Sequence, residues 1–175
     1  MRTVVGTTSE PDRTSTIGIA DLGWDPETVG EIDHRLLKAP SVKLRSISVG
    51  ANGDAVYCID LRVRRPNTGR RLTGVELHSL EHFLLEGYRR YLAAHFVSVG
   101  VMGCRTGFYL VFLNEGRADK ICMTLEAILK GIREATAVPY ARIDQCGGYR
   151  SHSLERAQRL ATEILERRSA WLIAV

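Results

Sequence analysis

The chain has no apolar run long enough to cross a bilayer, which takes about 20 residues in a helix. Its first residues also lack the apolar segment of a secretory signal peptide, so we expect a cytoplasmic protein with reduced thiols. Aromatic residues are few, at 7%, and the net charge of +4 is scattered along the sequence. We therefore expect neither a membrane nor a nucleic acid as partner.

One group of basic residues is denser than the rest. Arg62, Arg64 and Arg65 are followed closely by Arg70 and Arg71. Such a group can contact a phosphate or an anionic substrate, but basic runs more often lie in solvent. We interpret it as a solvated strand end and loop, with an anionic ligand as the alternative.

The four cysteines form no CxxC pair: Cys58, Cys104, Cys122 and Cys146 lie 46, 18 and 24 residues apart. With reduced thiols expected, they are candidates for ligands or catalysis rather than for bridges. Cys58 and Cys122 fall inside apolar patterns and are interpreted as structural. Cys104 and Cys146, each beside glycine, remain as functional candidates.

The composition, 45% hydrophobic and 25% charged over 175 residues, is typical of one globular domain. We expect a flexible N-terminal extension over residues 1–25 and a single catalytic, metal-binding domain over 26–175. Strand pairs interleaved with long helices indicate an α+β fold, with an antiparallel sheet covered by helices on one side. The apolar patterns predict strands at 41–49, 55–63, 96–102 and 108–113, and helices at 73–94, 119–135 and 153–168.

The stretch from His78 to His82 is the most informative one. In a helix, His78, Glu81 and His82 share one face, so the two imidazoles can bind one divalent metal ion and the carboxylate can reach whatever that ion binds. This HxxEH pattern also occurs by chance, and a catalytic metal site needs a third ligand. Cys146 is the natural candidate, because its Gly-rich loop can fold close to another element.

Cys104 lies in a tight turn between Gly103 and Gly107, next to Arg105. A nearby cation or metal ion lowers the pKa of a thiol and lets it act as base or acid. The alternative is a structural cysteine in a turn.

Three separate motifs, His78–His82, Met102–Tyr109 and Gln145–Gly147, have the order and rough spacing seen in S-ribosylhomocysteine lyase. The similarity extends to Asp33-His34, Asp60–Arg62 and His152–Leu154, and covers roughly residues 27 to 170. The chain thus resembles a divergent member of that family, called LuxS.

The resemblance implies a LuxS/metallohydrolase-like α+β homodimer with its active sites at the subunit interface. It further implies one divalent metal ion per subunit, Fe(II) or Zn(II). His78, His82 and Cys146 would hold this ion, Glu81 and Cys104 would be the acid/base groups, and His34 and Arg62 would line the substrate pocket.

The activity implied is that of a carbon–sulfur lyase acting on a small thioether sugar. S-ribosylhomocysteine would be converted to homocysteine and dihydroxypentanedione, the precursor of the autoinducer-2 signal, by carbonyl migration and β-elimination. Two segments depart from the family: Val29-Gly30 replaces Ser-Phe, and Ser98–Val101 replaces Asp-Ile-Ser-Pro. Both segments help hold the amino-acid end of the substrate in the family.

Three other hypotheses remain open. The same metal chemistry could act on a different sugar or thioether. A metallopeptidase would use Glu81 to activate water and take a downstream acidic ligand such as Glu155. A metal-stabilised binding protein would fill the fourth metal position with a side chain such as His34 or Cys104.

Overall fold

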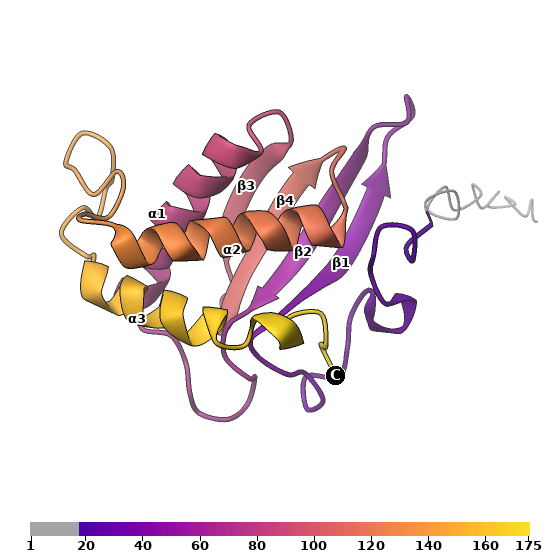
Figure 1. Ribbon diagram of the computed structural model, residues 1–175, viewed down its shortest axis with the longest axis horizontal. Helices are drawn as coiled ribbons and strands as arrows, with labels where there is room; N and C mark the ends of the chain where they lie inside the picture. Colours follow the sequence, from indigo (N-terminus) through magenta and orange to yellow (C-terminus); the bar gives the residue numbers. More distant parts are fainter. Residues whose placement is uncertain (1–17) are drawn as a thin grey trace, which may run out of the picture.

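The four strands of this computed structural model, which describes residues 18–175, form one antiparallel sheet in the order β1-β2-β4-β3 (Figure 1). The Asn52-Gly53 turn joins the first two strands, and Gly53 has a φ of 89°, a conformation that glycine adopts without strain. The strand predicted at 108–113 is an internal one. The strands are β1 (Ser41–Val49), β2 (Ala55–Arg62), β3 (Phe96–Val101) and β4 (Gly107–Leu113).

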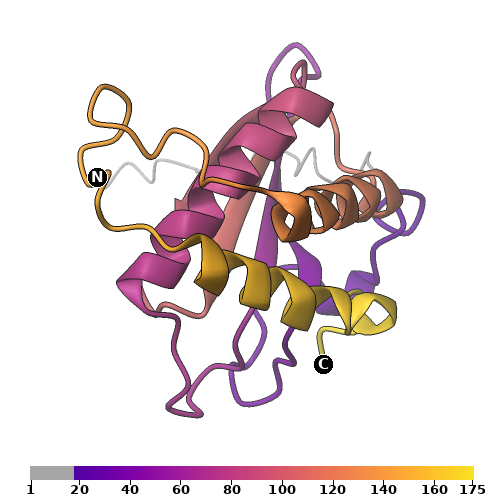
Figure 2. The ribbon, with the colours of Figure 1, turned by 60° about the vertical axis from the view of Figure 1, so that its left-hand side comes forward.

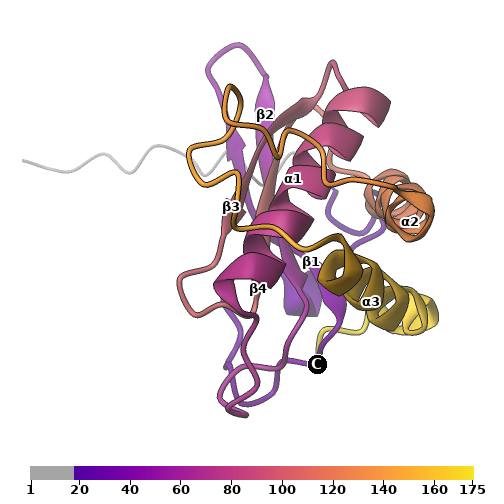
Figure 3. The ribbon, with the colours of Figure 1, turned by 90° about the vertical axis from the view of Figure 1, so that its left-hand side faces the viewer.

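Three helices cover one face of this sheet (Figures 2 and 3). α1 begins with a reciprocal capping box between Thr73 and Glu76, which satisfies free N–H groups of its first turn. The α+β fold with one covered face, predicted from the sequence, is confirmed. The helices are α1 (Gly74–Tyr91), α2 (Ala118–Glu134) and α3 (Leu154–Leu165), with short 3-10 turns η2 (Pro26–Thr28) and η3 (Arg168–Ala170).

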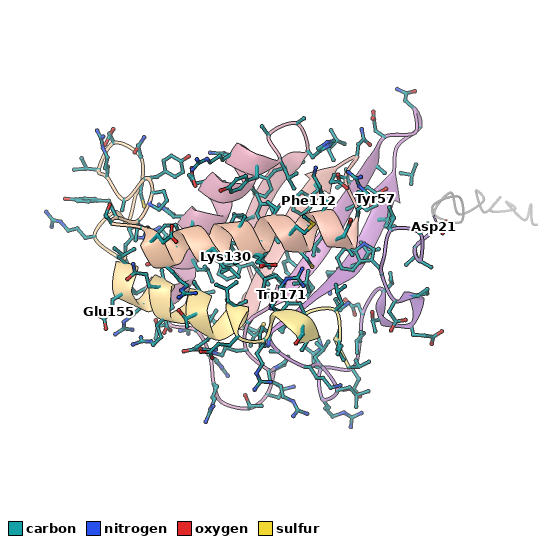
Figure 4. All side chains as sticks on the ribbon, in the orientation of Figure 1. Asp21, Tyr57, Phe112, Lys130, Glu155 and Trp171 are labelled. Carbon is teal, nitrogen blue, oxygen red and sulfur yellow. The ribbon has the colours of Figure 1, made fainter. Side chains whose placement is uncertain are left out.

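The core lies between the sheet and the helices. Ile59 and Leu61 of β2, which alternate with polar residues, are at most 1% exposed and face the helices. Phe112 and Trp171 are also fully buried, whereas Lys130 lies on the outer surface of α2 (Figure 4). The predicted helices extend a few residues too far: α1 ends at Tyr91, and α3 ends at Leu165 before η3.

None of the helices α1, α2 and α3 covers the opposite face of the sheet (Figure 3). Val56 and Leu113 on this face are 38% and 37% exposed. Asp60 and Arg62 lie on the same face, since they alternate with core residues along β2. This open face therefore combines apolar side chains with a buried ion pair.

Residues 1–17 of the predicted N-terminal extension lie outside the described residues. The remainder, residues 18–25, packs on the domain: Trp24 is 5% exposed, and its Nε1 donates to the carbonyl of Gly116 over 2.6 Å. Over residues 18–175, no helix combines the length and the apolar character needed to span a membrane.

Candidate active site

The face of α1 that carries His78 and His82 is fixed by the way this helix begins. The Thr73 capping box makes Gly74 the first helical residue, and within the helix His78 and His82 point to the same side because they are four residues apart. Their centroids lie 4.7 Å apart in an edge-to-face arrangement. Glu81, half-buried, comes from the same turn of the helix, so the predicted alignment of the three side chains follows from the observed helix.

Both imidazoles are held in one orientation by backbone carbonyls. His78 Nδ1 lies 3.1 Å from the oxygen of Ser151, and His82 Nδ1 lies 2.7 Å from that of Pro139. A carbonyl oxygen only accepts, so each ring carries its proton on Nδ1. The Nε2 lone pairs are left free, as in histidines that bind metal ions.

Cys146 joins this pair from the loop between α2 and α3. Its Sγ lies 3.3 Å from His78 Nε2 and accepts a hydrogen bond from the Gly148 amide over 3.4 Å. A tetrahedral zinc-type ion would hold sulfur and nitrogen ligands about 3.5 Å apart. A Cβ at Gly148 would lie 3.2 Å from Cε1 of His78, so this loop runs very close to the imidazole.

His152 is a fourth member of the cluster that the sequence left without a role. Its Nε2 lies 3.6 Å from Cys146 Sγ, and its ring packs on His78 with centroids 3.9 Å apart. The donor atoms of His78, His82, Cys146 and His152 all lie within 4.8 Å of one another. The spacing of six residues between Cys146 and His152 is the sequence signal that could have identified it.

His152 differs from the other two histidines in its second ring nitrogen. Its Nδ1 is buried and has no hydrogen-bond partner among the described residues. A buried N–H without an acceptor is costly, so the ring proton belongs on Nε2, facing Cys146. Burial and the neighbouring rings of His78 and His82 lower the pKa of His152 to about 4, so the ring is neutral at pH 7. The cluster thus offers two imidazole lone pairs, one thiol and one N–H donor, a set that fits a divalent ion of the zinc class.

Cys104 belongs to a second group, at the turn between β3 and β4. Its Sγ lies 3.0 Å from Thr106 Oγ1 and 3.7 Å from Nη1 of Arg62. Partial burial by itself would raise the pKa of the Cys104 thiol. The hydrogen bonds to Thr106 and the charge of Arg62 outweigh that effect and hold this pKa below its usual value. The thiol is therefore a better proton acceptor near neutral pH than an ordinary cysteine.

A buried ion pair fixes the guanidinium beside this thiol. Arg62 Nη2 donates to Asp60 Oδ2 over 2.6 Å, and the side chains of Arg62 and Asp60 are 3% and 2% exposed. Arg62 Nη1 donates to Thr106 Oγ1 over 2.6 Å. The two hydrogen bonds hold the Arg62 guanidinium in one orientation. Removing Asp60 or Arg62 would leave an uncompensated buried charge.

The predicted site residues thus fall into two groups. His78, His82 and Cys146 come together between α1 and the loop before α3, with Glu81 on α1. Arg62 contacts Cys104, and His34 lines a cavity of about 400 Å³ together with that thiol. Within residues 18–175, no hydrogen bond or ion pair connects the two groups.

The structure also bears on the other hypotheses. The fourth donor beside the predicted ligands is His152, and neither His34 nor Cys104 belongs to the cluster. Glu155, the acidic ligand considered for a metallopeptidase, is exposed on α3 and is not part of the cluster either. A metallopeptidase is therefore not favoured.

Comparison with known proteins gives a consistent result. The family model described as S-Ribosylhomocysteinase (LuxS) matches residues 29–174. A protein of Halobacillus halophilus named S-ribosylhomocysteine lyase is 41% identical over 140 residues, which are 80% of this chain and 91% of that protein. Proteins of the same name from Oceanobacillus iheyensis and Staphylococcus aureus are 40% and 38% identical, again over 80% of this chain and over 90% and 88% of their own lengths.

Proposed function

Because this chain belongs to the S-ribosylhomocysteinase (LuxS) family, we propose that it is a carbon–sulfur lyase that cleaves S-ribosylhomocysteine. The products would be homocysteine and dihydroxypentanedione, the autoinducer-2 precursor. Residues 26–175 would act as one catalytic domain in the cytoplasm. The observation that carries this proposal is the convergence of His78, His82 and Cys146 on one point, next to a helix turn that also presents Glu81.

We assign His78, His82 and Cys146 as ligands of one divalent ion per subunit, Fe(II) or Zn(II). When bound, such an ion would polarise a sugar carbonyl as a Lewis acid. The hydrogen bonds from Nδ1 of His78 and His82 to backbone carbonyls support this assignment, because they leave both Nε2 atoms available. An imidazole–thiolate set suits a zinc-class ion, and the donor types alone are also compatible with iron.

Glu81 and Cys104 are the two groups proposed to move protons. The substrate carries its aldehyde at C1 and its thioether at C5, so moving the carbonyl from C1 to C2 and then to C3 requires proton removal beside a carbonyl at each step. The same groups return each proton to the neighbouring carbon or oxygen. The lowered pKa of Cys104 supports a basic role near neutral pH.

The last step needs no further reactant. With the carbonyl at C3, the proton on C4 is acidic, and its removal forms a C4–C5 double bond as the C5–S bond breaks. The electron pair leaves with the homocysteine sulfur, which is protonated as the free thiol. A thiolate and a carboxylate in different positions suit these successive transfers, while Arg62 and His34 would bind the sugar beside Cys104.

We further propose a homodimer with its active sites at the interface. Asp60 and Arg62 lie on the open face of the sheet, whereas the metal cluster is formed by α1 and the loop before α3. A second copy against the open face would cover the apolar side chains of Val56 and Leu113. The Cys104 group contacts no residue of the metal cluster within residues 18–175, which supports a partner chain that completes each active site.

Thiol release from S-ribosylhomocysteine tests the activity directly. Metal-loaded protein is incubated anaerobically with the substrate, and free homocysteine is titrated with a thiol reagent. We expect release by the natural protein, and loss of release with retained metal content for Glu81→Gln. Absence of thiol release from the natural protein would overturn the proposed activity, and full turnover by Glu81→Gln would remove the acid/base role of this residue.

A further inference from the structure

The cavity beside Cys104 has one wall made of arginines. Its volume is about 400 Å³, within the range of small-molecule sites. Arg65, Arg70 and Arg71 come from the loop after β2, and Cys104 and Thr106 come from the turn before β4. No aspartate or glutamate is among the described residues that line it.

A neighbouring cavity of the same chain contains both arginines and glutamates. It shares Arg65 and Arg70 but also contains Glu163 and Glu166. There Arg64 Nη2 donates to Glu163 Oε2 over 2.6 Å. By contrast, Arg65, Arg70 and Arg71 form no ion pair with any residue in 18–175, and the Arg65 guanidinium donates only to the backbone carbonyl of Arg35, over 3.0 Å.

Three guanidinium groups around one concave space repel each other and raise the local positive potential. Binding of an anion relieves this repulsion, and a concave wall of low dielectric strengthens the attraction. The planar fork of arginine matches the two oxygens of a carboxylate or a phosphate. The loop that presents these side chains is shaped by two left-handed residues, Asn67 and Gly69, with φ of 59° and 75°.

We propose that Arg65, Arg70 and Arg71 form an anion subsite next to Cys104, and that this subsite holds an oxyanion of the substrate. The oxyanion is the carboxylate at the amino-acid end of S-ribosylhomocysteine, or a phosphate if the enzyme takes a different sugar substrate. Only its assignment to the substrate rests on the proposed function. The subsite itself follows from the uncompensated arginines and the cavity.

Cys104 provides a reporter of this subsite that does not depend on turnover. Iodoacetate and iodoacetamide alkylate a thiolate in the same way, but only iodoacetate is anionic. In the metal-loaded protein, we expect the ratio of the iodoacetate rate to the iodoacetamide rate to be higher at Cys104 than at a free thiol. In the double variant Arg70→Ala, Arg71→Ala, we expect the iodoacetate rate to fall about tenfold and the iodoacetamide rate to change less than about twofold.

The rates are read from Cys104-containing peptides by mass spectrometry, so that alkylation of Cys146 is not counted. Arg64→Ala is the matched control, because it removes an arginine that Glu163 already balances, and it should leave the ratio of the two rates unchanged. An equal fall for both reagents, or no fall, in the double variant would overturn the subsite.

Competing anions separate the two sources of the oxyanion. Inorganic phosphate and acetate are each added during iodoacetate alkylation of Cys104. Protection by phosphate at much lower concentration than by acetate assigns a phosphate group, and comparable protection assigns a carboxylate. Protection by neither anion would refute the subsite.

The two proposals fail in distinguishable ways. If S-ribosylhomocysteine releases no thiol but the selectivity for iodoacetate persists, the activity is wrong and the anion subsite stands. If thiol is released and the double variant leaves both the selectivity and the KM unchanged, the lyase stands and the subsite is refuted.

Discussion

At the residue scale, the four donors of the metal cluster are not equivalent. His78 and His82 present a lone pair on Nε2, because a carbonyl oxygen takes the Nδ1 proton of each ring. His152 has no such acceptor for Nδ1 and therefore directs an N–H toward the sulfur of Cys146. We interpret His152 as a positioning residue for the ligand thiolate rather than as a ligand.

Metal affinity distinguishes these roles. Cys146→Ala should abolish stoichiometric binding, because it removes a proposed ligand. His152→Ala should keep one ion per chain and weaken affinity about tenfold, the usual effect of losing a group that hydrogen-bonds to a ligand. Competition with a chromogenic chelator measures both values. A loss of stoichiometry in His152→Ala would show that His152 itself binds the metal ion.

The pKa of Cys104 gives a second prediction at this scale. Since the folded protein holds this pKa below its usual value, iodoacetamide should reach half its maximal rate at Cys104 at a lower pH than with a free cysteine. Thr106→Val removes a hydrogen bond to the thiolate, so the midpoint should move upward.

The lowered pKa of Cys104 also determines how its contribution to the stability of the fold depends on pH. A depressed pKa means that the folded state favours the thiolate, so this contribution to stability is present at high pH and is lost as the pH falls through the folded pKa.

Thr162→Val is a suitable control for the Thr106→Val alkylation experiment, since its hydroxyl donates to the Gln158 carbonyl on α3, away from the thiol. An unmoved midpoint in Thr106→Val would contradict the role given to this hydroxyl.

At the element scale, the close crossing of α1 and α2 depends on a glycine. Gly87 lies within α1, where glycine disfavours the helix by about 1 kcal/mol relative to alanine. A Cβ at this position would lie 2.4 Å from Cγ1 of Ile128 on α2. Packing between the two helices therefore explains why the helix carries a residue that its own propensity disfavours.

Alanine substitution separates packing from propensity. Gly87→Ala should lower the free energy of unfolding by about 1–2 kcal/mol, because overpacking costs more than the helix gains. Gly131→Ala on α2 is the matched control: its Cβ would meet no atom within 4 Å, so it should raise stability by up to about 1 kcal/mol. Urea unfolding measures both, and a stabilised Gly87→Ala would contradict the tight crossing.

The elements themselves were largely predictable from the sequence. Alternating and helical apolar patterns placed all four strands and three helices to within a few residues, since each must bury one face. The alignment of His78, Glu81 and His82 followed from helix geometry in the same way. The sequence marks Arg65, Arg70 and Arg71 as a basic group and places His152 six residues after Cys146. That these arginines share a cavity and that His152 joins the cluster could not be predicted, because all of them sit on loops whose paths depend on tertiary contacts rather than on periodicity.

At the scale of the whole molecule, the separation of Cys104 from the metal cluster predicts complementation between subunits. Glu81→Gln and Cys104→Ala should each be inactive. If each active site takes Glu81 from one chain and Cys104 from its partner, a one-to-one mixture of the two variants forms dimers with one intact site. Activity should then recover to about a quarter of the natural value after random subunit exchange.

Thiol release after mild unfolding and refolding of the mixed chains measures this recovery. Each variant refolded alone is the control. A mixture as inactive as the separate variants would place Glu81 and Cys104 of each active site in the same chain.

The spacing of the ligands also fixes the order in which the site assembles. His78 and His82 are brought together as soon as α1 forms, whereas Cys146 follows His82 by 64 residues, with β3, β4 and α2 in between. Contacts between positions so far apart form late in folding, because closing a long loop has an entropic cost that earlier structure must offset. We therefore expect the ion to be captured only after α1 has formed and the loop that carries Cys146 has reached this helix.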